Sequence, residues 1–145
     1  MKVKRANCLA VSFLFGMLLA SGCVSGSSQA PHVYPEPRSD KALVYFFREW
    51  RSFGGGASYN VRERGEVIGR LPNASYFTVF ADPGRHIYSG DEDAKDDPIR
   101  RLEAGKTYYI KCSPRGTHSG SRLALELVEE SAGQALLPRL RCVTK

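Results

Sequence analysis

The chain has 145 residues and a formal net charge of +6. Three of its basic residues, Lys2, Lys4 and Arg5, stand in the first five positions, and the rest of the chain carries a net charge of +3. The basic balance therefore gives no support for nucleic-acid binding, and the length excludes two full-sized domains.

The first 22 residues have the layout of a secretory signal peptide. A basic start is followed by an apolar run from about Leu9 to Ala20 and then by the small residues Ser21 and Gly22. This run is shorter than the roughly 20 apolar residues that a membrane-spanning helix needs. We therefore expect residues 1–22 to be cleaved off, with plain secretion and an uncleaved anchor as the alternatives.

A cysteine stands directly at the expected cleavage point. The string Leu19-Ala20-Ser21-Gly22-Cys23 resembles the lipobox of bacterial lipoproteins. The resemblance implies diacylation of the Cys23 thiol and attachment to a membrane, since two or three acyl chains hold a small domain stably on a bilayer. The residue after Cys23 is Val24. An Asp at this position would resemble the signal that retains lipoproteins in the inner membrane, so we expect an outer-membrane protein that faces the periplasm.

Residues 23–41 are predicted to be the lipidated cysteine and a flexible linker. This segment is rich in Ser, Gly and Pro and has no hydrophobic periodicity. Residues 42–145 are predicted to form a single domain, because from Ala42 onward short strand-like runs alternate with turn residues.

The run Ala42–Arg48 is apolar on both faces, which is typical of a central strand covered on both sides. Further strands are expected at 59–63, 67–71, 76–80, 85–89, 99–102 and 107–112. Arg64-Gly65-Glu66 indicates a hairpin, and Asp82-Pro83-Gly84 a tight turn.

The C-terminal part is less uniform in pattern. Residues 123–128 alternate with a period of two, with Leu123, Leu125 and Leu127 on one face; strand is favoured, with helix as the alternative. Ser131–Leu137 is expected to form one or two helical turns ended by Pro138. About six to eight short strands predict an all-β fold, an antiparallel β-sandwich with a short C-terminal helical turn.

Five segments together resemble a known family. They are Val44-Tyr45-Phe46-Phe47-Arg48, Val67-Ile68-Gly69-Arg70-Leu71, Asn73-Ala74-Ser75-Tyr76-Phe77, Asp82-Pro83-Gly84-Arg85-His86 and the run Leu102-Glu103-Ala104-Gly105-Lys106-Thr107-Tyr108-Tyr109. From Ala42 to Leu137 the chain resembles domain-of-unknown-function family 2846. The resemblance implies a compact bacterial lipoprotein with an immunoglobulin-like or PEGA-like β-sandwich, and it supplies no catalytic residues.

Two cysteines remain after the signal peptide and the lipidated position. In an oxidising periplasm, an even pair indicates a disulfide, here between Cys112 and Cys142. The alternative is two buried thiols that never meet. Cys and His at zinc spacing are absent from the sequence, so no metal or other cofactor is expected.

One segment combines aromatic and guanidinium groups beside a glycine run. Its candidate binding residues are Arg48, Trp50, Arg51, Phe53 and Tyr59, with Gly54-Gly55-Gly56 between them. Such groups on a loop suit peptide capture or stacking on sugars. The alternative is that Trp50 and Phe53 cap the open end of the sandwich.

Other motifs give no chemistry. The acidic segment 91–97 lacks the glycine and the final glutamate of an EF-hand loop, so a solvated loop is expected. Gly105-Lys106-Thr107 lacks the first glycine of a phosphate-binding loop and indicates a turn. No Gly-x-Ser-x-Gly elbow is present in the sequence, and His86 is expected to face solvent beside a turn.

The sequence therefore predicts a membrane-anchored envelope protein without catalytic activity, acting as a binding or structural module that docks onto other envelope proteins. A glycan- or peptidoglycan-binding module that uses Trp50 and Arg51 is the first alternative. An enzyme of unrecognised type is the second.

Overall fold

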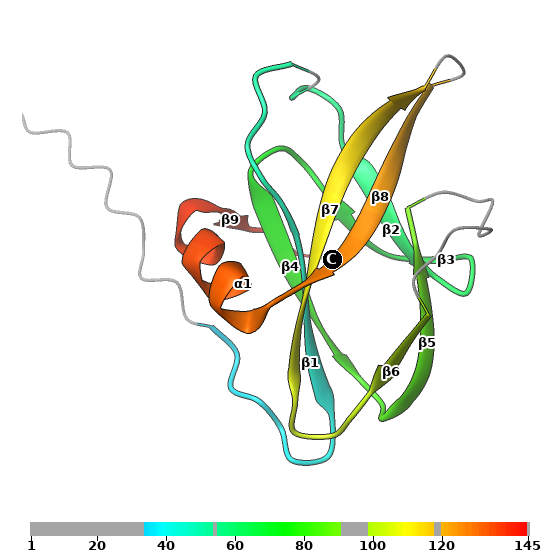
Figure 1. The fold of residues 1–145 in the computed structure, drawn as a ribbon, viewed down its shortest axis with the longest axis vertical. Helices are drawn as coiled ribbons and strands as arrows, with labels where there is room; N and C mark the ends of the chain where they lie inside the picture. Colours follow the sequence, from blue (N-terminus) through cyan, green and yellow to red (C-terminus); the bar gives the residue numbers. More distant parts are fainter. Residues whose placement is uncertain (1–33, 54, 91–98, 118–119, 145) are drawn as a thin grey trace, which may run out of the picture. The chain divides into compact units, whose positions relative to one another are not determined.

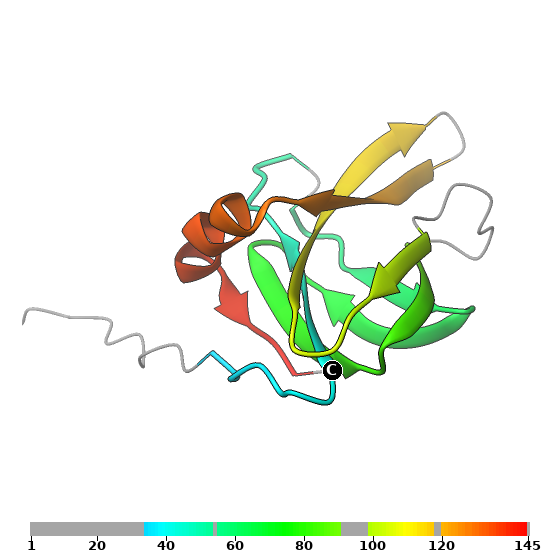
Figure 2. The same ribbon diagram turned by 60° about the horizontal axis from the view of Figure 1, so that its bottom comes forward.

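The structure is a computed structural model that describes residues 34–53, 55–90, 99–117 and 120–144. Two β-sheets face each other, and one short helix follows the last long strand (Figures 1 and 2). The strands, in chain order, are β1 (Ala42–Arg48), β2 (Tyr59–Glu63), β3 (Glu66–Leu71), β4 (Ser75–Ala81), β5 (Gly84–Ser89), β6 (Ile99–Leu102), β7 (Thr107–Thr117), β8 (Gly120–Val128) and β9 (Arg141–Cys142). Helix α1 spans Glu130–Leu136, and the 3-10 turn η2 spans Leu137–Arg139.

The predicted all-β sandwich is confirmed. One sheet has five strands in the order β8-β7-β1-β4-β9, and the other has four in the order β3-β2-β5-β6. The five-stranded sheet is mixed, because β1 pairs in parallel with β7 and β4 pairs in parallel with β9. The segment at 123–128 is a strand, as favoured, and the helical turns follow where they were expected.

The chain reversals follow the turn residues. Between β2 and β3, Arg64 and Gly65 both have positive φ, at 50° and 88°, which matches the two-residue hairpin turns that twist with the strands. Gly84 has φ 140° after Asp82-Pro83, a conformation that L side chains rarely adopt.

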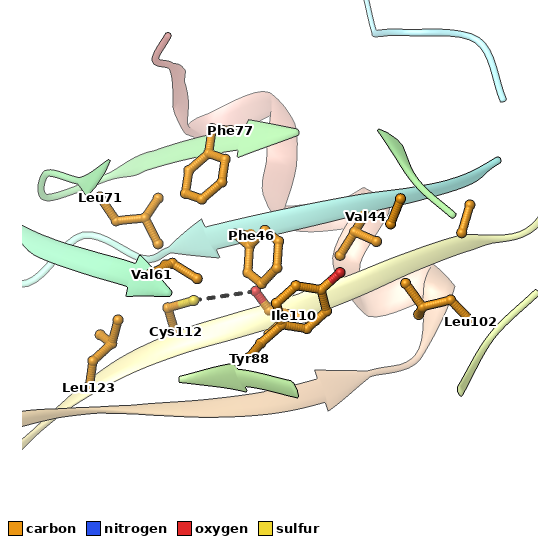
Figure 3. Close-up of a cluster of buried hydrophobic side chains, with 12 residues drawn as sticks. Val44, Phe46, Val61, Leu71, Phe77, Tyr88, Leu102, Ile110, Cys112 and Leu123 are labelled. Atoms are coloured by element: carbon orange, nitrogen blue, oxygen red, sulfur yellow. Dashed lines mark hydrogen bonds between the residues drawn. The ribbon is translucent and has the colours of Figure 1, made fainter. Parts of the chain in front are cut away.

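Strand β1 is covered on both faces, as its sequence predicts. Val44 and Phe46 point into the inter-sheet core, the cluster of side chains between the two sheets (Figure 3). Tyr45 and Phe47 point to the opposite side, where η2 and the segment before β1 cover the sheet. We call this second cluster the tyrosine face; it comprises Leu43, Tyr45, Phe47, Tyr76, Tyr109, Leu137 and Leu140.

Part of the segment assigned to the linker contacts the domain. The Tyr34 ring lies 6.5 Å from the Tyr45 ring and 6.2 Å from the Tyr76 ring, centroid to centroid. The guanidinium of Arg38 lies 5.4 Å from the centre of the Phe80 ring. Residues 34–38 therefore lie along the tyrosine face.

Candidate functional site

The segment between β1 and β2, residues 49–58, carries the two most exposed aromatic side chains of the described chain. We call it the aromatic loop. Trp50 is 68% exposed and Phe53 is 95% exposed. The alternative in which both rings cap the sandwich is therefore wrong, because a capping ring would be largely covered.

The backbone of the aromatic loop is held at Arg51 by Asn73, in the connection between β3 and β4. The Arg51 N–H donates to Asn73 Oδ1 at 3.0 Å, and Asn73 Nδ2 donates to the Arg51 carbonyl at 2.9 Å. Gly55 packs closely against this pair, because an added Cβ would lie 2.6 Å from the Arg51 oxygen and 2.7 Å from Asn73 Nδ2. The close approach explains the glycine at position 55.

Arg48 anchors the other end of the loop and is not a surface residue. Its side chain is 1% exposed and donates to the Ala57 carbonyl at 2.6 Å and to the Leu71 carbonyl at 3.4 Å. The guanidinium lies 4.8 Å from the centre of the half-buried Tyr59 ring. Burial lowers the pKa of Arg48, but an arginine stays charged in proteins. The expectation that Arg48 belongs to the binding surface is wrong, since it instead holds β1, the loop and β3 together.

Arg51 connects the aromatic loop to the β7–β8 hairpin. Its guanidinium donates to the Pro114 carbonyl at 3.2 Å. The next residue, Arg115, is exposed and lies directly opposite the exposed Arg122 on β8. Among the described residues neither of these two arginines forms an ion pair, and like charges placed opposite each other destabilise a strand pair. Two arginines without an ion-pair partner in the described part of the chain therefore lie on the hairpin beside the point that Arg51 contacts, an arrangement that no sequence pattern signals.

The predicted disulfide between Cys112 and Cys142 is wrong, because both cysteines are free. Cys112 is buried in the inter-sheet core, with its Sγ 3.7 Å from the Ile110 carbonyl (Figure 3). Cys142 is exposed on β9, which β1 and β4 separate from β7 in the sheet. Three strand spacings amount to about 14 Å, twice the Cα separation that a disulfide can span.

His86 is a structural residue and does not face solvent as expected. Its Nδ1 contacts the Glu63 carboxylate, and its Nε2 lies 2.8 Å from the Asp82 carbonyl. Only 12% of the His86 side chain is exposed. Both ring nitrogens are thus engaged in tying β5 to β2 and to the β4–β5 turn, which leaves no nitrogen for catalysis.

The remaining motifs fall partly inside and partly outside the described residues. Gly105 has φ 75° in the turn before β7, in agreement with the expected turn. Within residues 34–53, 55–90, 99–117 and 120–144, no group of three His, Cys, Asp or Glu side chains is placed to hold a metal ion. The acidic segment 91–97 and Cys23 lie outside the described residues.

A groove that the sequence does not signal lies beside β4. It has a volume of about 660 Å³, and its walls come from the β2–β3 hairpin, β4, the β4–β5 turn and β5. Half-buried Ile68 and Val79 contribute apolar surface, and charged residues of both signs surround them. No local pattern signals it, since its walls come from strands of both sheets.

No protein-family model, curated protein or solved structure matches the chain. The resemblance to domain-of-unknown-function family 2846 therefore stays a prediction. No helix in the part of the chain that the structure describes is long and apolar enough to cross a membrane.

Proposed function

We propose that the chain is a lipid-anchored envelope protein that has no catalytic activity and docks onto another envelope protein through the aromatic loop. The anchor is the lipid on Cys23, and the domain faces the periplasm from the outer membrane. The signal-peptide layout and the lipobox-like string before Cys23 support the location. The aromatic loop supports the docking role.

The observation that carries the proposal is the exposure of Trp50 and Phe53 on a loop whose backbone is held at Arg51 by Asn73. Large aromatic side chains dominate the binding energy of many protein interfaces, and Arg is the other residue enriched there. Burying a ring removes about 150–250 Å² from water, a gross gain of roughly 4–6 kcal/mol. Because two hydrogen bonds to Asn73 already hold the backbone of Arg51, next to Trp50, less ordering free energy is spent at this position on binding.

The neighbouring charges favour an acidic partner surface. The exposed Arg115 and Arg122 face each other across β7 and β8, beside the point where Arg51 reaches the Pro114 carbonyl. A carboxylate between the two guanidinium groups would relieve their repulsion and form charge-assisted hydrogen bonds. We therefore expect the partner to combine an apolar pocket for the rings with acidic groups at its rim.

Photocrosslinking in intact cells tests the proposal. The photoreactive residue p-benzoylphenylalanine is placed at Phe53 and, as a matched control, at Val67, which is 50% exposed on β3. We expect a discrete protein adduct from position 53, absent from position 67 and lost when Trp50→Ala is added. Equal adducts from both positions, or an adduct that persists with Trp50→Ala, would contradict the docking role.

Glycan binding is the second candidate, since a Trp ring beside Arg51 also suits stacking on a sugar. The near-complete exposure of Phe53 argues against glycan binding. Small-molecule sites are concave, and a ring that lines a concave site is partly covered by the residues around it. Sedimentation with purified peptidoglycan fragments separates the two. Binding that Trp50→Ala and Arg51→Ala abolish, while protein adducts persist, would favour the glycan.

A further inference from the structure

Strand β4 has one covered edge and one edge that is covered only in part. Along one side, β1 pairs with it from Ser75 to Ala81. Along the other side, β9 pairs only with Ser75 and Tyr76. Val143, which follows β9, donates its N–H to the Tyr76 carbonyl and packs against the inter-sheet core, so it lies beside Phe77. The rest of that edge, from Thr78 to Ala81, has no neighbouring strand among the described residues.

The hydrogen bonds to β9 show which backbone groups point to this side. The Arg141 N–H donates to the Ala74 carbonyl and the Val143 N–H to the Tyr76 carbonyl, each at 2.9 Å. Because backbone groups alternate along a strand, those of Thr78 and Phe80 point in the same direction as those of Tyr76. Within the described chain, the register of β1, β4 and β9 gives the outward N–H and C=O of Thr78 and Phe80 no backbone partner.

The groove of about 660 Å³ lies beside this half of β4. Val79, Phe80 and Ala81 all line it, and since consecutive residues point to opposite faces, the strand borders the groove with its edge. Ile68 of β3 and Val79 supply the apolar part. The half-edge itself carries no Lys, Pro or bulge, the devices that usually protect an exposed strand edge.

The rim of the groove carries three charges without an ion-pair partner in the described chain. Arg64 lies in the turn between β2 and β3, Glu66 extends from β3, and Arg85 extends from β5. The other charged rim groups are engaged, since Glu63 contacts His86 and Asp82 contacts Lys41. A ligand in the groove can therefore be matched by charges of both signs.

We propose that the free half-edge of β4 binds an extended peptide strand of a partner protein, which takes the place beside Thr78 and Phe80 that β9 takes beside Tyr76. Backbone hydrogen bonds supply affinity, and alternate side chains entering the groove supply specificity. The bound strand has apolar side chains toward Ile68 and Val79, a basic side chain near Glu66 and an acidic one near Arg85. This second surface goes beyond the proposed function and does not depend on the aromatic loop.

The test uses the full chain and a phage-displayed library of random dodecapeptides. Thr78→Pro removes the outward N–H without removing a hydrogen bond to β1, and Thr78→Val, which keeps the N–H, is the matched control. We expect enriched peptides with alternating apolar residues that bind the wild type and Thr78→Val equally and Thr78→Pro at least about tenfold more weakly, the cost of about one hydrogen bond. Trp50→Ala should leave this binding unchanged, which separates it from the proposed docking.

Amide hydrogen exchange of the wild type provides the second measurement, which stays decisive if Thr78→Pro does not fold. A bound peptide should slow exchange at Thr78 and Phe80. No enriched peptide, or binding without slower exchange at these two amides, would overturn the proposal. Protection that appears without peptide and grows with protein concentration would also overturn it, in favour of edge pairing between two copies of the chain.

Discussion

Asn73 pairs with both backbone groups of Arg51: its side-chain oxygen accepts the Arg51 N–H at 3.0 Å, and its side-chain nitrogen donates to the Arg51 carbonyl at 2.9 Å. An asparagine side chain carries one acceptor and one NH₂ donor group, like a backbone amide. The Asn73 side chain therefore makes the two hydrogen bonds to Arg51 that a neighbouring strand would otherwise make. The aromatic loop is thereby held at Arg51, outside the sheets.

Replacing Asn73 should loosen the loop. Asn73→Ala removes both hydrogen bonds, and we expect a loss of about 1–2 kcal/mol in the free energy of unfolding together with faster amide exchange at Arg51. Asn73→Asp keeps the acceptor, so its free energy of unfolding in urea should lie between those of the wild type and Asn73→Ala. An unchanged Arg51 exchange rate in Asn73→Ala would mean that other contacts order the loop.

Removing the buried guanidinium should cost more. Arg48→Met fills much of the same space but leaves the carbonyls of Ala57 and Leu71 without their donor and removes the contact with Tyr59. We expect a loss of about 2–4 kcal/mol in the free energy of unfolding. Arg70→Met, at an exposed position on β3, is the control and should change the free energy of unfolding by less than about 0.5 kcal/mol. Similar values for both variants would refute the structural role of Arg48.

The two thiols should differ sharply in reactivity. Burial raises the pKa of Cys112 and removes it from solvent, whereas Cys142 is exposed. A thiol reagent followed by peptide mass spectrometry should label Cys142 in the native protein and Cys112 only after unfolding. If neither residue is labelled until a reductant is added, the two are bridged and the arrangement of β7 and β9 is incorrect.

The tyrosine face should make the domain sensitive to alkali. Burial, with a further contribution from Tyr109, raises the pKa of Tyr45 from 10.0 to about 12, and burial also raises the pKa of Tyr76 and Tyr109. Because the folded state holds these protons more tightly than the unfolded state, their stabilisation is complete below pH 10 and is lost as the pH rises from 10 toward 12.

Circular dichroism and tyrosinate absorbance measured together across this range should therefore change in step. Tyr45→Phe removes one of the titrating groups and keeps the packing, so it should shift unfolding to higher pH. Tyrosinate absorbance that is complete before any loss of structure would show that these hydroxyls are not buried.

The sequence predicted the parts of the fold that depend on local chemistry. The double-sided apolar pattern of Ala42–Arg48 identified a central strand, and the positive-φ turn at Arg64-Gly65 follows from its glycine. The exposure of Trp50 and Phe53 agrees with the predicted surface, but Arg48, which the sequence also assigns to that surface, is buried.

What the sequence did not predict depends on which strands become neighbours. The parallel pairing of β4 with β9 places Cys142 far from Cys112 across the sheet, and no spacing in the chain encodes this order. The role of Arg48 depends on its hydrogen bonds to the Ala57 and Leu71 carbonyls. The placement of Arg115 opposite Arg122 depends on the pairing of β7 with β8. Such contacts between distant residues exist only after folding.

Hydroxyl-radical footprinting in intact cells, compared with the purified protein, tests most directly whether the aromatic loop is a docking site. The account predicts that Trp50 and Phe53 become several-fold less reactive in cells, while Val67, half exposed on β3, reacts equally in both. Equal reactivity of Trp50 and Phe53 in cells and in purified protein would contradict it.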